Sequence, residues 1–521
     1  MHLIRRMIAR VLALILLATP ATAQTLRIGT QSPFVVDPHQ VFLGPDMAVA
    51  RMIYDSFVGR DSESNWVPGL ALSWSAPDDH TWEFKLRPDV MFSDGSPFTA
   101  DDVVYSIERV RTLETPSSYA TNLRSIVAVT ALDPLTVRIT TDRPNAVLPG
   151  QLTNIFIVSA KAFRAAPLGA IQSGVVSVGT GPFTLETFTR GERLELNRNE
   201  RYWGTKPAWT HVSERVITND GSRVAALLAG DLDLIDVIAP SYVDRLSHTP
   251  GVLVQKHASD RVMFLQPNVR LDRLPLATDQ SGAPLPTNPL RDLLVRRALS
   301  LAIDRKALAE RAFEGDAIPA SQLVPPGFGG YDPSLPVLPY DLARARALLA
   351  QAGYAQGFGL TIACTNNRYV ADEKVCQVVG QMLERIGLKI RVDVLPGSVL
   401  FARSRPEVNE YPLLLSGQSN SASRDPTHVI SLALHSADGR GSGTSNRGGF
   451  DDPALDHAID DAVSRRAEDR EGALHAAMMQ GVALGAAIPL YVQTVVTASR
   501  LPTRYAPRMD EQTVAQNARP N

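Results

Sequence analysis

The chain is poor in cysteine and in long apolar runs, and it has no excess of charge of one sign. Only two of its 521 residues are cysteines, so a disulfide-rich scaffold is excluded. After the first 23 residues, no segment is both apolar and long enough to cross a membrane. The formal net charge of −2 gives no electrostatic footprint for nucleic acid or an anionic membrane surface. We therefore expect no nucleic-acid partner and no direct membrane insertion.

Sequence motifs of enzymes are missing as well. The chain has no G-x-S-x-G, H-E-x-x-H, Walker A or C-G-x-C segment. Adjacent acids occur at 101–102, 451–452 and 460–461, but these pairs lie at predicted helix starts or on helix faces. Compensation of the helix dipole and solvation account for them there. We expect a protein that is not an enzyme and that carries no cofactor.

The residues that commonly bind metals are also dispersed. Asp37 and His39 flank a proline and fit a turn, and the ten histidines are scattered. A direct metal site normally needs three or four protein ligands, so none is expected. Cys364 and Cys376 have neither C-x-x-C spacing nor a nearby histidine. They either form a disulfide or remain two small buried residues, and the sequence leaves both alternatives open.

The first 23 residues have the features of a secretory signal peptide. Three arginines precede an apolar run over 11–18, and residues 21–23 form an A-x-A cleavage pattern. The run is about half the roughly 20 residues of a membrane anchor, which disfavours that alternative. Twin-arginine export is a further alternative, but paired arginines are ordinary in such segments. Cleavage before Gln24 leaves no cysteine for lipid attachment, and it changes the net charge from −2 to −5 because three arginines and no acids are removed. The prediction is a soluble periplasmic protein.

Sheet and helix alternate along the rest of the chain. About 500 residues exceed what one hydrophobic core organises, so two or three lobes are expected. In the second half, a helix predicted over 341–352 stops at Gly353 and is followed by a strand-helix-strand unit with strands at 360–364 and 388–394. Elsewhere, hydrophobic patterning predicts strands at 26–30, 82–86, 135–139 and 194–196, and a helix at 222–228.

Residues 92–109 are the most informative segment. Asp94 and Gly95 form a turn dipeptide, and Thr99 is placed to cap a helix with Asp102 at its third position. Apolar residues then recur on one face of that helix at Val103, Val104, Ile107 and Val110. The segment predicts a strand, a tight turn and a capped amphipathic helix.

The same segment resembles the signature of large extracytoplasmic solute-binding proteins that serve peptide and nickel ABC importers. Further matching segments occur in the order and spacing of that family, at 52–57, 68–74, 85–87, 179–183, 199–203, 229–233, 295–305 and 344–349. The chain is therefore identified as a member of solute-binding protein family 5, the peptide/nickel-binding class. The resemblance implies an α/β fold of the periplasmic-binding-protein type, with two ligand-enclosing lobes, an inserted extra lobe and a hinge.

The resemblance also implies a division of the chain and a function. Lobe I comprises 24–57, 178–265 and 490–521, the inserted lobe II comprises 58–177, and lobe III comprises 266–489. The expected function is capture of an oligopeptide or peptide-like polar solute by lobe closure and its delivery to a membrane permease with its ATPase. A sugar, opine or metal-chelate receptor is an alternative, and so is a periplasmic sensor or chaperone. A monomer is expected.

Candidate ligand contacts lie on loops, because a rigid sheet positions binding residues there. The candidates are Ser32, Phe34, Gln418, Ser419, Asn420, Arg424 and Asn446. Core packing of Phe34 and a solvated loop at 417–426 or near Asn446 are the alternatives.

Departures from the family pattern bear on the ligand. Peptide-binding members often carry a Trp and an Asp after the strand that corresponds to 411–416, and that Asp pairs with the amino group of the peptide. Here no Trp is present and the first acid is Asp425. We therefore expect an anionic or neutral polar group, rather than an ammonium group, to bind at the loop from Gln418 to Arg424.

Overall fold

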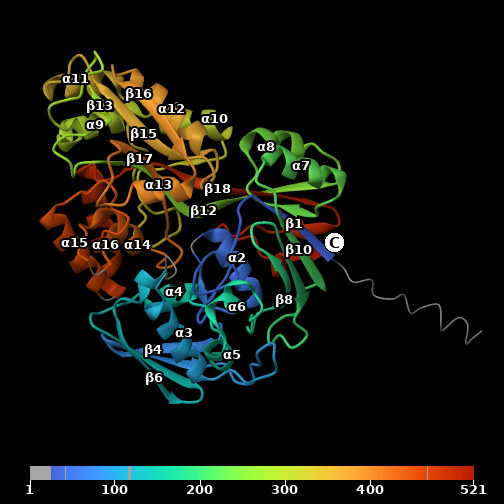
Figure 1. The fold of residues 1–521 in the computed structure, drawn as a ribbon. Helices are drawn as coiled ribbons and strands as arrows, with labels where there is room; N and C mark the ends of the chain where they lie inside the picture. The colour runs from blue at the N-terminus through green and yellow to red at the C-terminus, as the bar shows by residue number, and fades with distance from the viewer. Residues whose placement is uncertain (1–24, 42, 115–118, 440, 466, 521) are drawn as a thin grey trace, which may run out of the picture.

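A computed structural model describes residues 25–41, 43–114, 119–439, 441–465 and 467–520, and the predicted signal segment at 1–23 lies outside them. The chain forms three bodies that meet near the centre of the molecule (Figure 1). Two of them share one large sheet, and the third carries a separate sheet. This arrangement confirms the prediction of a multi-lobed α/β fold.

The large sheet is mixed, and the described residues contribute twelve strands to it. These are β1 (Thr25–Thr30), β8 (Phe183–Thr189), β9 (Arg193–Arg198), β10 (His211–Val216), β11 (Leu234–Ile235), β12 (Val252–Pro267), β13 (Ala277–Thr278), β14 (Ile318–Pro319), β15 (Gly359–Thr365), β16 (Lys389–Leu395), β17 (Leu413–Ser419) and β18 (Ile488–Arg500). Their order is β13-β15-β17-β12-β18-β11-β1-β10-β9-β8, with β14 beside β18 and β16 beside β15.

The long strands β12 and β18 join the two halves of this sheet. They pair antiparallel from Val252 opposite Arg500 to Leu265 opposite Ile488. β12 also pairs with β17 on one side, and β18 pairs with β11 on the other. Residues 262–266 and 488–492 belong to these two strands.

The half around β1 has three parallel strands at its centre, because β1 pairs in parallel with both β10 and β11. Leu26 and Ile28 alternate along β1 and are fully buried, as a central strand requires. The predicted helix at 222–228 is confirmed as part of α7. The helices of this half are α2 (Gly44–Ile53), α7 (Asp220–Ala229) and α8 (Pro240–Ser247), and its C-terminal strands are β19 (Thr503–Tyr505) and β20 (Ala518–Pro520).

The body at the bottom of Figure 1 is an antiparallel sheet covered by α3 (Ala100–Thr112). The carboxylate of Asp102 accepts a hydrogen bond from the Thr99 amide at 2.9 Å, so the predicted capping box is present. The strands, in the order β4-β5-β7-β6, are β4 (Ala71–Asp78), β5 (Thr81–Leu86), β7 (Thr136–Thr141) and β6 (Ile126–Asp133). Shorter elements are β2 (Gly59–Arg60), β3 (Trp66–Val67), α4 (Leu148–Gln151), α5 (Ala160–Ala165) and α6 (Leu168–Gln172).

The other half of the large sheet contains the predicted strand-helix-strand unit. β15 leads through α12 (Asp372–Glu384) to β16, and the two strands are parallel. Cys364 of β15 and Cys376 of α12 form a disulfide with 6.5 Å between their Cα atoms, which decides between the two alternatives for these cysteines. The predicted helix at 341–352 is also confirmed. The further helices are α9 (Leu293–Ala302), α10 (Arg305–Phe313), α11 (Leu342–Gln351), α13 (Gly397–Arg403), α14 (Thr427–Val429), α15 (Pro453–Ser464) and α16 (Ala467–Ala483).

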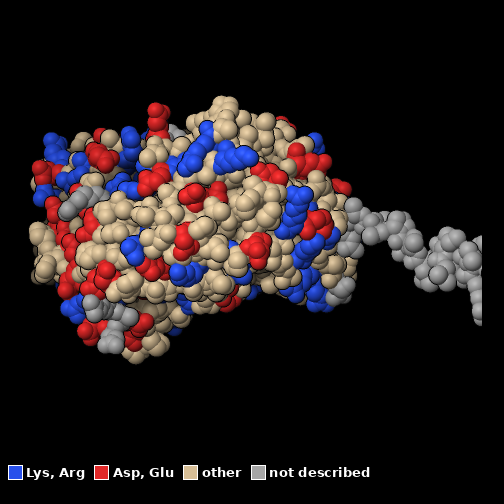
Figure 2. Space-filling view, turned by 90° about the horizontal axis from the view of Figure 1, so that it is seen from below, with Lys and Arg blue, Asp and Glu red and all other residues tan. Residues whose placement is uncertain are grey.

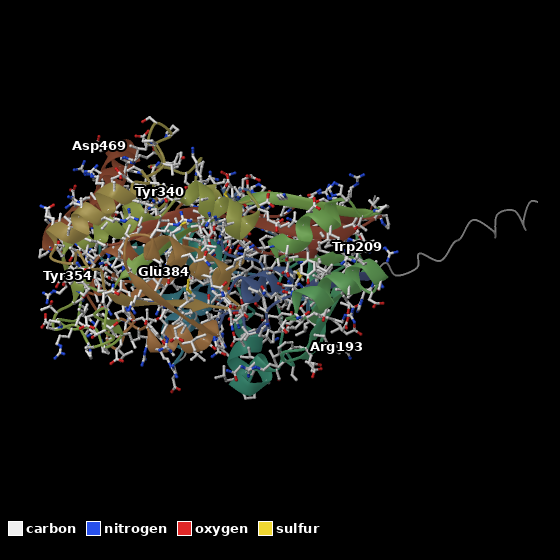
Figure 3. The ribbon with its side chains drawn as sticks, turned by 90° about the horizontal axis from the view of Figure 1, so that it is seen from above. Arg193, Trp209, Tyr340, Tyr354, Glu384 and Asp469 are labelled. Atoms are coloured by element: carbon white, nitrogen blue, oxygen red, sulfur yellow. A yellow bond between two sulfur atoms is a disulfide. The ribbon has the colours of Figure 1, made fainter. Side chains whose placement is uncertain are left out.

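The surface carries both signs of charge. Figure 2 shows basic and acidic side chains interspersed on one face, with wide uncharged areas between them. From another side, Figure 3 places Arg193 and Trp209 at the opposite end of the molecule from Tyr354 and Glu384. None of the described helices has both the length and the apolar character that a membrane crossing requires.

Candidate ligand-binding site

Cavities lie between the two halves of the large sheet, next to the carboxyl ends of parallel strands. Thr30, at the end of β1, and Asp236, just after β11, line one cavity. Ser419, at the end of β17, lines a neighbouring one. Loops that leave the carboxyl ends of parallel strands form the usual ligand-binding crevice of open α/β sheets. The topology therefore directs attention to this region.

The cavity lined by Ser419 has a volume of about 180 Å³ and three arginines in its wall. We call it the arginine cavity, after Arg261, Arg368 and Arg447. Tyr119 and Asn154 from the inserted body also line it, so all three bodies contribute. None of its described lining residues is acidic. This charge pattern favours an anionic or neutral polar group over a cation.

Arg368 is the arginine with the most available guanidinium. Among the described residues its side chain makes no hydrogen bond or ion pair, and its Cζ atom lies 5.0 Å from the centroid of the Tyr369 ring. Burial, and then the charge of Arg261, lowers the pKa of Arg368. A half-buried guanidinium without an anionic partner is well suited to a carboxylate or phosphate of a ligand. Sequence reasoning missed this residue, although it closely follows the strand predicted at 360–364.

The other two arginines are held by protein groups. Arg261 forms an ion pair with Glu511 at 3.0 Å. Arg447 donates hydrogen bonds to the carbonyl oxygens of Phe401 and Ser404 at 3.2 and 3.0 Å. Their positions are therefore fixed before a ligand arrives, which lowers the entropic cost of binding.

His428 adds a neutral polar group to the same wall. Burial, and secondly the charge of Arg261, lowers its pKa to about 4. The imidazole is uncharged at pH 7 and is able to donate one hydrogen bond and accept another.

The structure brings three of the seven predicted contact residues to cavities. Gln418 and Ser419 line the arginine cavity, and Ser32 lines the cavity of Thr30 and Asp236. Gln418 and Ser419 are the last two residues of β17, whereas the sequence predicts them on the loop that follows a strand at 411–416. Ligand contact by these residues stays a prediction.

The remaining four predicted residues do not line either of these cavities. Phe34 is buried, with its ring centroid 6.1 Å from that of Phe188. Asn420 is fully buried, and its amide donates to the Leu323 carbonyl at 3.1 Å. The amide group of Asn446 donates to the carbonyl oxygens of His435 and Phe450 and accepts the Phe450 amide hydrogen. The position of Phe34 matches the core alternative, whereas Asn446 is buried and therefore does not match the alternative of a solvated loop.

Arg424 contacts the inserted body instead of a cavity. Its guanidinium donates to the Glu63 carbonyl at 2.7 Å and to the side chain of Asn65. Its Cζ atom also lies 5.0 Å from the centroid of the Phe328 ring. The predicted contact of Arg424 with a ligand remains a prediction, and the structure gives this residue a role in joining two bodies.

The cavity lined by Thr30 and Asp236 has a volume of about 70 Å³. It adjoins the arginine cavity and shares Leu43 and Arg368 with it. We call it the acidic cavity, because Glu214, Asp236 and Glu511 line it. Burial, and then the neighbouring Asp236, raises the pKa of Glu214 to about 8. Glu214 lies on the same face of β10 as the buried Val212.

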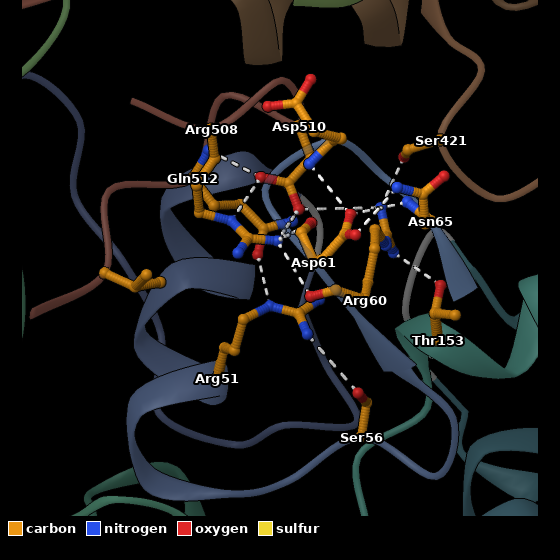
Figure 4. A network of polar contacts seen from close by, with 12 residues as sticks. Arg51, Ser56, Arg60, Asp61, Asn65, Thr153, Ser421, Arg508, Asp510 and Gln512 are labelled. Carbon is orange, nitrogen blue, oxygen red and sulfur yellow. Dashed lines mark hydrogen bonds and ion pairs between the residues drawn. The ribbon is translucent and has the colours of Figure 1, made fainter. Parts of the chain in front are cut away.

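A buried network of charges lies beside the arginine cavity (Figure 4). Arg60 donates to Thr153 at 2.7 Å and to Ser421, which lines the cavity. Asp510 pairs with Arg508 at 2.7 Å and lies 3.9 Å from Arg60. Burial alone would raise the pKa of Asp510, but the surrounding arginines hold it at about 2. The network connects the inserted body and the C-terminal segment to the rim of the site.

Residues suggested by the metal alternative are used otherwise. Asp37 accepts two hydrogen bonds from Arg109 at 2.9 and 2.7 Å. The Nε2 atom of His39 lies 2.8 Å from the Phe156 carbonyl oxygen. Across the described part of the chain, no three His, Cys, Asp or Glu side chains are grouped as a metal site requires.

Solved structures with the same fold include several binding proteins. The periplasmic binding protein DppA from Helicobacter pylori, in complex with the peptide STSA, superposes with a TM-score of 0.80 and 23% identity, covering 95% of this chain and 98% of DppA. NikZ from Campylobacter jejuni, in complex with Ni(L-His), gives a TM-score of 0.80 at 19% identity, covering 95% and 99%. At such identities the likeness establishes the fold.

Sequence comparison establishes the family. The glutathione-binding protein GsiB of Escherichia coli (strain K12) is 28% identical over 362 residues, which are 69% of this chain and 67% of GsiB. The family model described as "Bacterial extracellular solute-binding proteins, family 5 Middle" matches residues 65–440. This chain therefore belongs to family 5 of the bacterial extracellular solute-binding proteins, the ligand-binding components of ABC importers.

Proposed function

We propose that this protein is the periplasmic receptor of an ABC importer for an oligopeptide or peptide-like solute with an anionic group. The observation that carries the proposal is Arg368, a half-buried guanidinium that forms no ion pair with the described residues and that lines the arginine cavity, in which no described lining residue is acidic. A carboxylate of the ligand would supply the missing counter-charge through two parallel hydrogen bonds. Gln418 and Ser419 would add neutral contacts. No group in this site is assigned a catalytic role, and transport energy comes from the partner ATPase.

Capture is proposed to occur by lobe closure. The proposed division keeps lobe I at 24–57, 178–265 and 490–521, lobe II at 58–177 and lobe III at 266–489. Separate apolar cores around Ile28, Phe84 and Leu299 support three bodies, although residues 156–171 of the proposed lobe II contribute Phe156 and Phe163 to the core around Ile28. Lobes I and III are connected through β12 and β18, so a bend in these strands would open and close the cavities.

We propose a location in the periplasm, which the family and the predicted signal peptide support. We propose cleavage before Gln24 and no lipid anchor, since no cysteine follows the predicted cut. Closed protein would then diffuse to the permease and present a surface formed by both large lobes.

Mass spectrometry of small molecules retained after native purification tests the ligand class. The expected result is a peptide or peptide derivative with at least one carboxylate. A retained neutral sugar would contradict the proposal and would favour the sugar alternative. If no molecule is retained, calorimetric titration with reduced glutathione and trialanine replaces this step, and failure of both to bind would also contradict the proposal.

The variant Arg368→Gln tests the anionic contact. Loss of a hydrogen bond to a charged group costs about 1.5–3 kcal/mol, so the dissociation constant should rise roughly tenfold or more. Arg273→Gln is the matched control, because Arg273 is exposed on the same half of the molecule. Unchanged affinity of Arg368→Gln would refute the proposed role of this arginine.

Arg424→Gln completes the comparison. If Arg424→Gln lowers the affinity for the ligand as much as Arg368→Gln does, this result would support the ligand contact that the sequence predicts for Arg424. An affinity equal to that of the control would leave Arg424 with its contacts to Glu63 and Phe328.

A further inference from the structure

Two buried carboxylates in the acidic cavity lack the partners that such groups normally have. Glu214 and Asp236 are only 3% and 8% exposed. Oε2 of Glu214 and Oδ1 of Asp236 have no hydrogen-bond partner among the described residues. Buried acids are ordinarily paired with cations or fully hydrogen-bonded, because removing a charge from water is costly. Each of these two groups therefore needs an explanation.

The surrounding protein supplies little compensation. Thr30 donates one hydrogen bond to Oδ2 of Asp236 at 3.1 Å, and the backbone amides of Gln31 and Asp236 also lower the pKa of this carboxyl. The buried Arg223 directs one terminal nitrogen to Asp220 and to the Val237 carbonyl, each at 2.7 Å, although its charge is near enough to lower the pKa of Asp236. Glu214 has no such cation, and the nearest charge that affects it is Asp236 itself. Because its pKa is raised to about 8, Glu214 is largely protonated at pH 7 in the ligand-free protein, and an incoming cation would displace this proton and leave a carboxylate facing the cavity.

The position of this pair relative to Arg368 is the second observation. Arg368 and Leu43 line both cavities, so the two cavities adjoin each other at these residues. One wall offers an available guanidinium and the other offers two unpaired carboxylate oxygens. A ligand that lies across the shared wall would meet opposite charges at its two ends.

We propose that Glu214 and Asp236 form a cation subsite, which accepts an ammonium or guanidinium group of the same ligand whose anionic group contacts Arg368. This inference rests on the proposed function and makes it narrower, because it requires a ligand with separated positive and negative charges. The volume of about 70 Å³ suits a small head group rather than a whole aromatic side chain. A metal ion fits less well, since the described residues offer no cluster of three ligating side chains here.

The ammonium group also explains why no acid is needed on the loop after β17. In the arrangement proposed here, the positive end of the ligand lies against lobe I, and the acids come from the ends of β10 and β11. The carboxylate end lies against lobe III. Closure would bring both ends into contact at once, so the charge separation of the ligand would select the closed state.

The test compares amines with their blocked derivatives. Trialanine and reduced glutathione are titrated beside their N-acetyl derivatives, which keep the carboxylates and lose the ammonium group. We expect the free amines to bind wild-type protein at least tenfold more tightly. In Glu214→Gln and Asp236→Asn this preference should fall to near one, while the affinity for the N-acetyl forms stays unchanged. The unchanged affinity also shows that the variants are folded.

Two controls make the outcome specific. Glu192→Gln removes an exposed carboxylate from the same half of the molecule and should retain the full preference. Titrations in choline chloride instead of sodium chloride test for an inorganic cation, and binding that requires sodium would overturn the inference in favour of a metal ion.

The possible failures are distinguishable. Equal affinity of wild-type protein for free and N-acetylated forms would overturn the cation subsite and leave the proposed function standing. Failure of all four compounds to bind would overturn the proposed function and this inference together. If both variants still bind the free amines more tightly than the N-acetyl forms, the ammonium group binds elsewhere. This result would overturn the assignment to Glu214 and Asp236.

Discussion

Replacing Glu214 by Gln should stabilise the ligand-free protein, and by an amount that grows with pH. Burial and the neighbouring Asp236 raise the pKa of this carboxyl from 4.5 to about 8 in the folded protein. A raised pKa of an acid means that the folded state favours the proton. The contribution of Glu214 to stability is therefore intact below pH 4.5, is lost as pH rises, and is fully lost above about pH 8.

The magnitude follows from the size of the shift. A difference of about 3.5 pH units between 4.5 and about 8 corresponds to roughly 3–5 kcal/mol when the folded protein must ionise the group. Between pH 5.5 and pH 8.5 the change is about 3 kcal/mol of unfolding free energy. Gln keeps the shape of the side chain and cannot ionise, so Glu214→Gln should not show this loss.

Urea unfolding of both proteins at these two pH values is the measurement, and hydrogen exchange of β10 locates the effect in the half that carries Glu214. The variant should gain about 3 kcal/mol relative to wild type on going from pH 5.5 to pH 8.5. Glu192→Gln should show no such gain, because Glu192 is exposed. The reasoning would be refuted if the unfolding free energies of Glu214→Gln and wild type differed by the same amount at pH 5.5 and at pH 8.5.

Three further outcomes are expected. Cys364→Ser should lower the free energy of unfolding by about 3 kcal/mol, the chain-entropy value for a disulfide that spans 12 positions, and urea unfolding without reductant that finds no loss would argue against a stabilising bridge. N-terminal sequencing of protein from a periplasmic extract should begin at or near Gln24, and a lipid-modified or uncut product would contradict the proposed processing. Small-angle scattering should give a smaller radius of gyration with saturating ligand than without it, and an unchanged value would count against hinge closure.

Much of the local structure could be predicted because its signals are short-range. Thr99 and Asp102 are three residues apart, so the capping box is visible in the sequence and α3 begins where expected. The unit β15-α12-β16 could also be predicted from the sequence, because the spacing of apolar residues changes from period 2 to period 3.6 and back. The family resemblance added the arrangement of the lobes, which local patterns do not contain.

The site could be predicted only in part from the sequence, because it depends on contacts between distant parts of the chain. Gln418 and Ser419 closely follow the strand predicted at 411–416, and a position near a strand end is a local property. Arg368 and Glu214 become neighbours of one ligand space only after two halves of the chain meet. A buried charge also gives no distinct signal in the sequence, because an isolated Glu among apolar residues looks the same whether it is solvated or enclosed.

The place of β1 in the sheet has a consequence for dissection of the molecule. β1 starts at Thr25 and lies between β10 and β11, while β11 pairs with residues 498–499 near the other end of the chain. Neither terminus can be shortened past these strands without leaving open sheet edges, which promote aggregation. The pairing of strands far apart in the sequence also predicts slow refolding, because the entropy of loop closure is lost before these non-local contacts form. A single-lobe fragment suitable for NMR would therefore have to be built by circular permutation rather than by truncation.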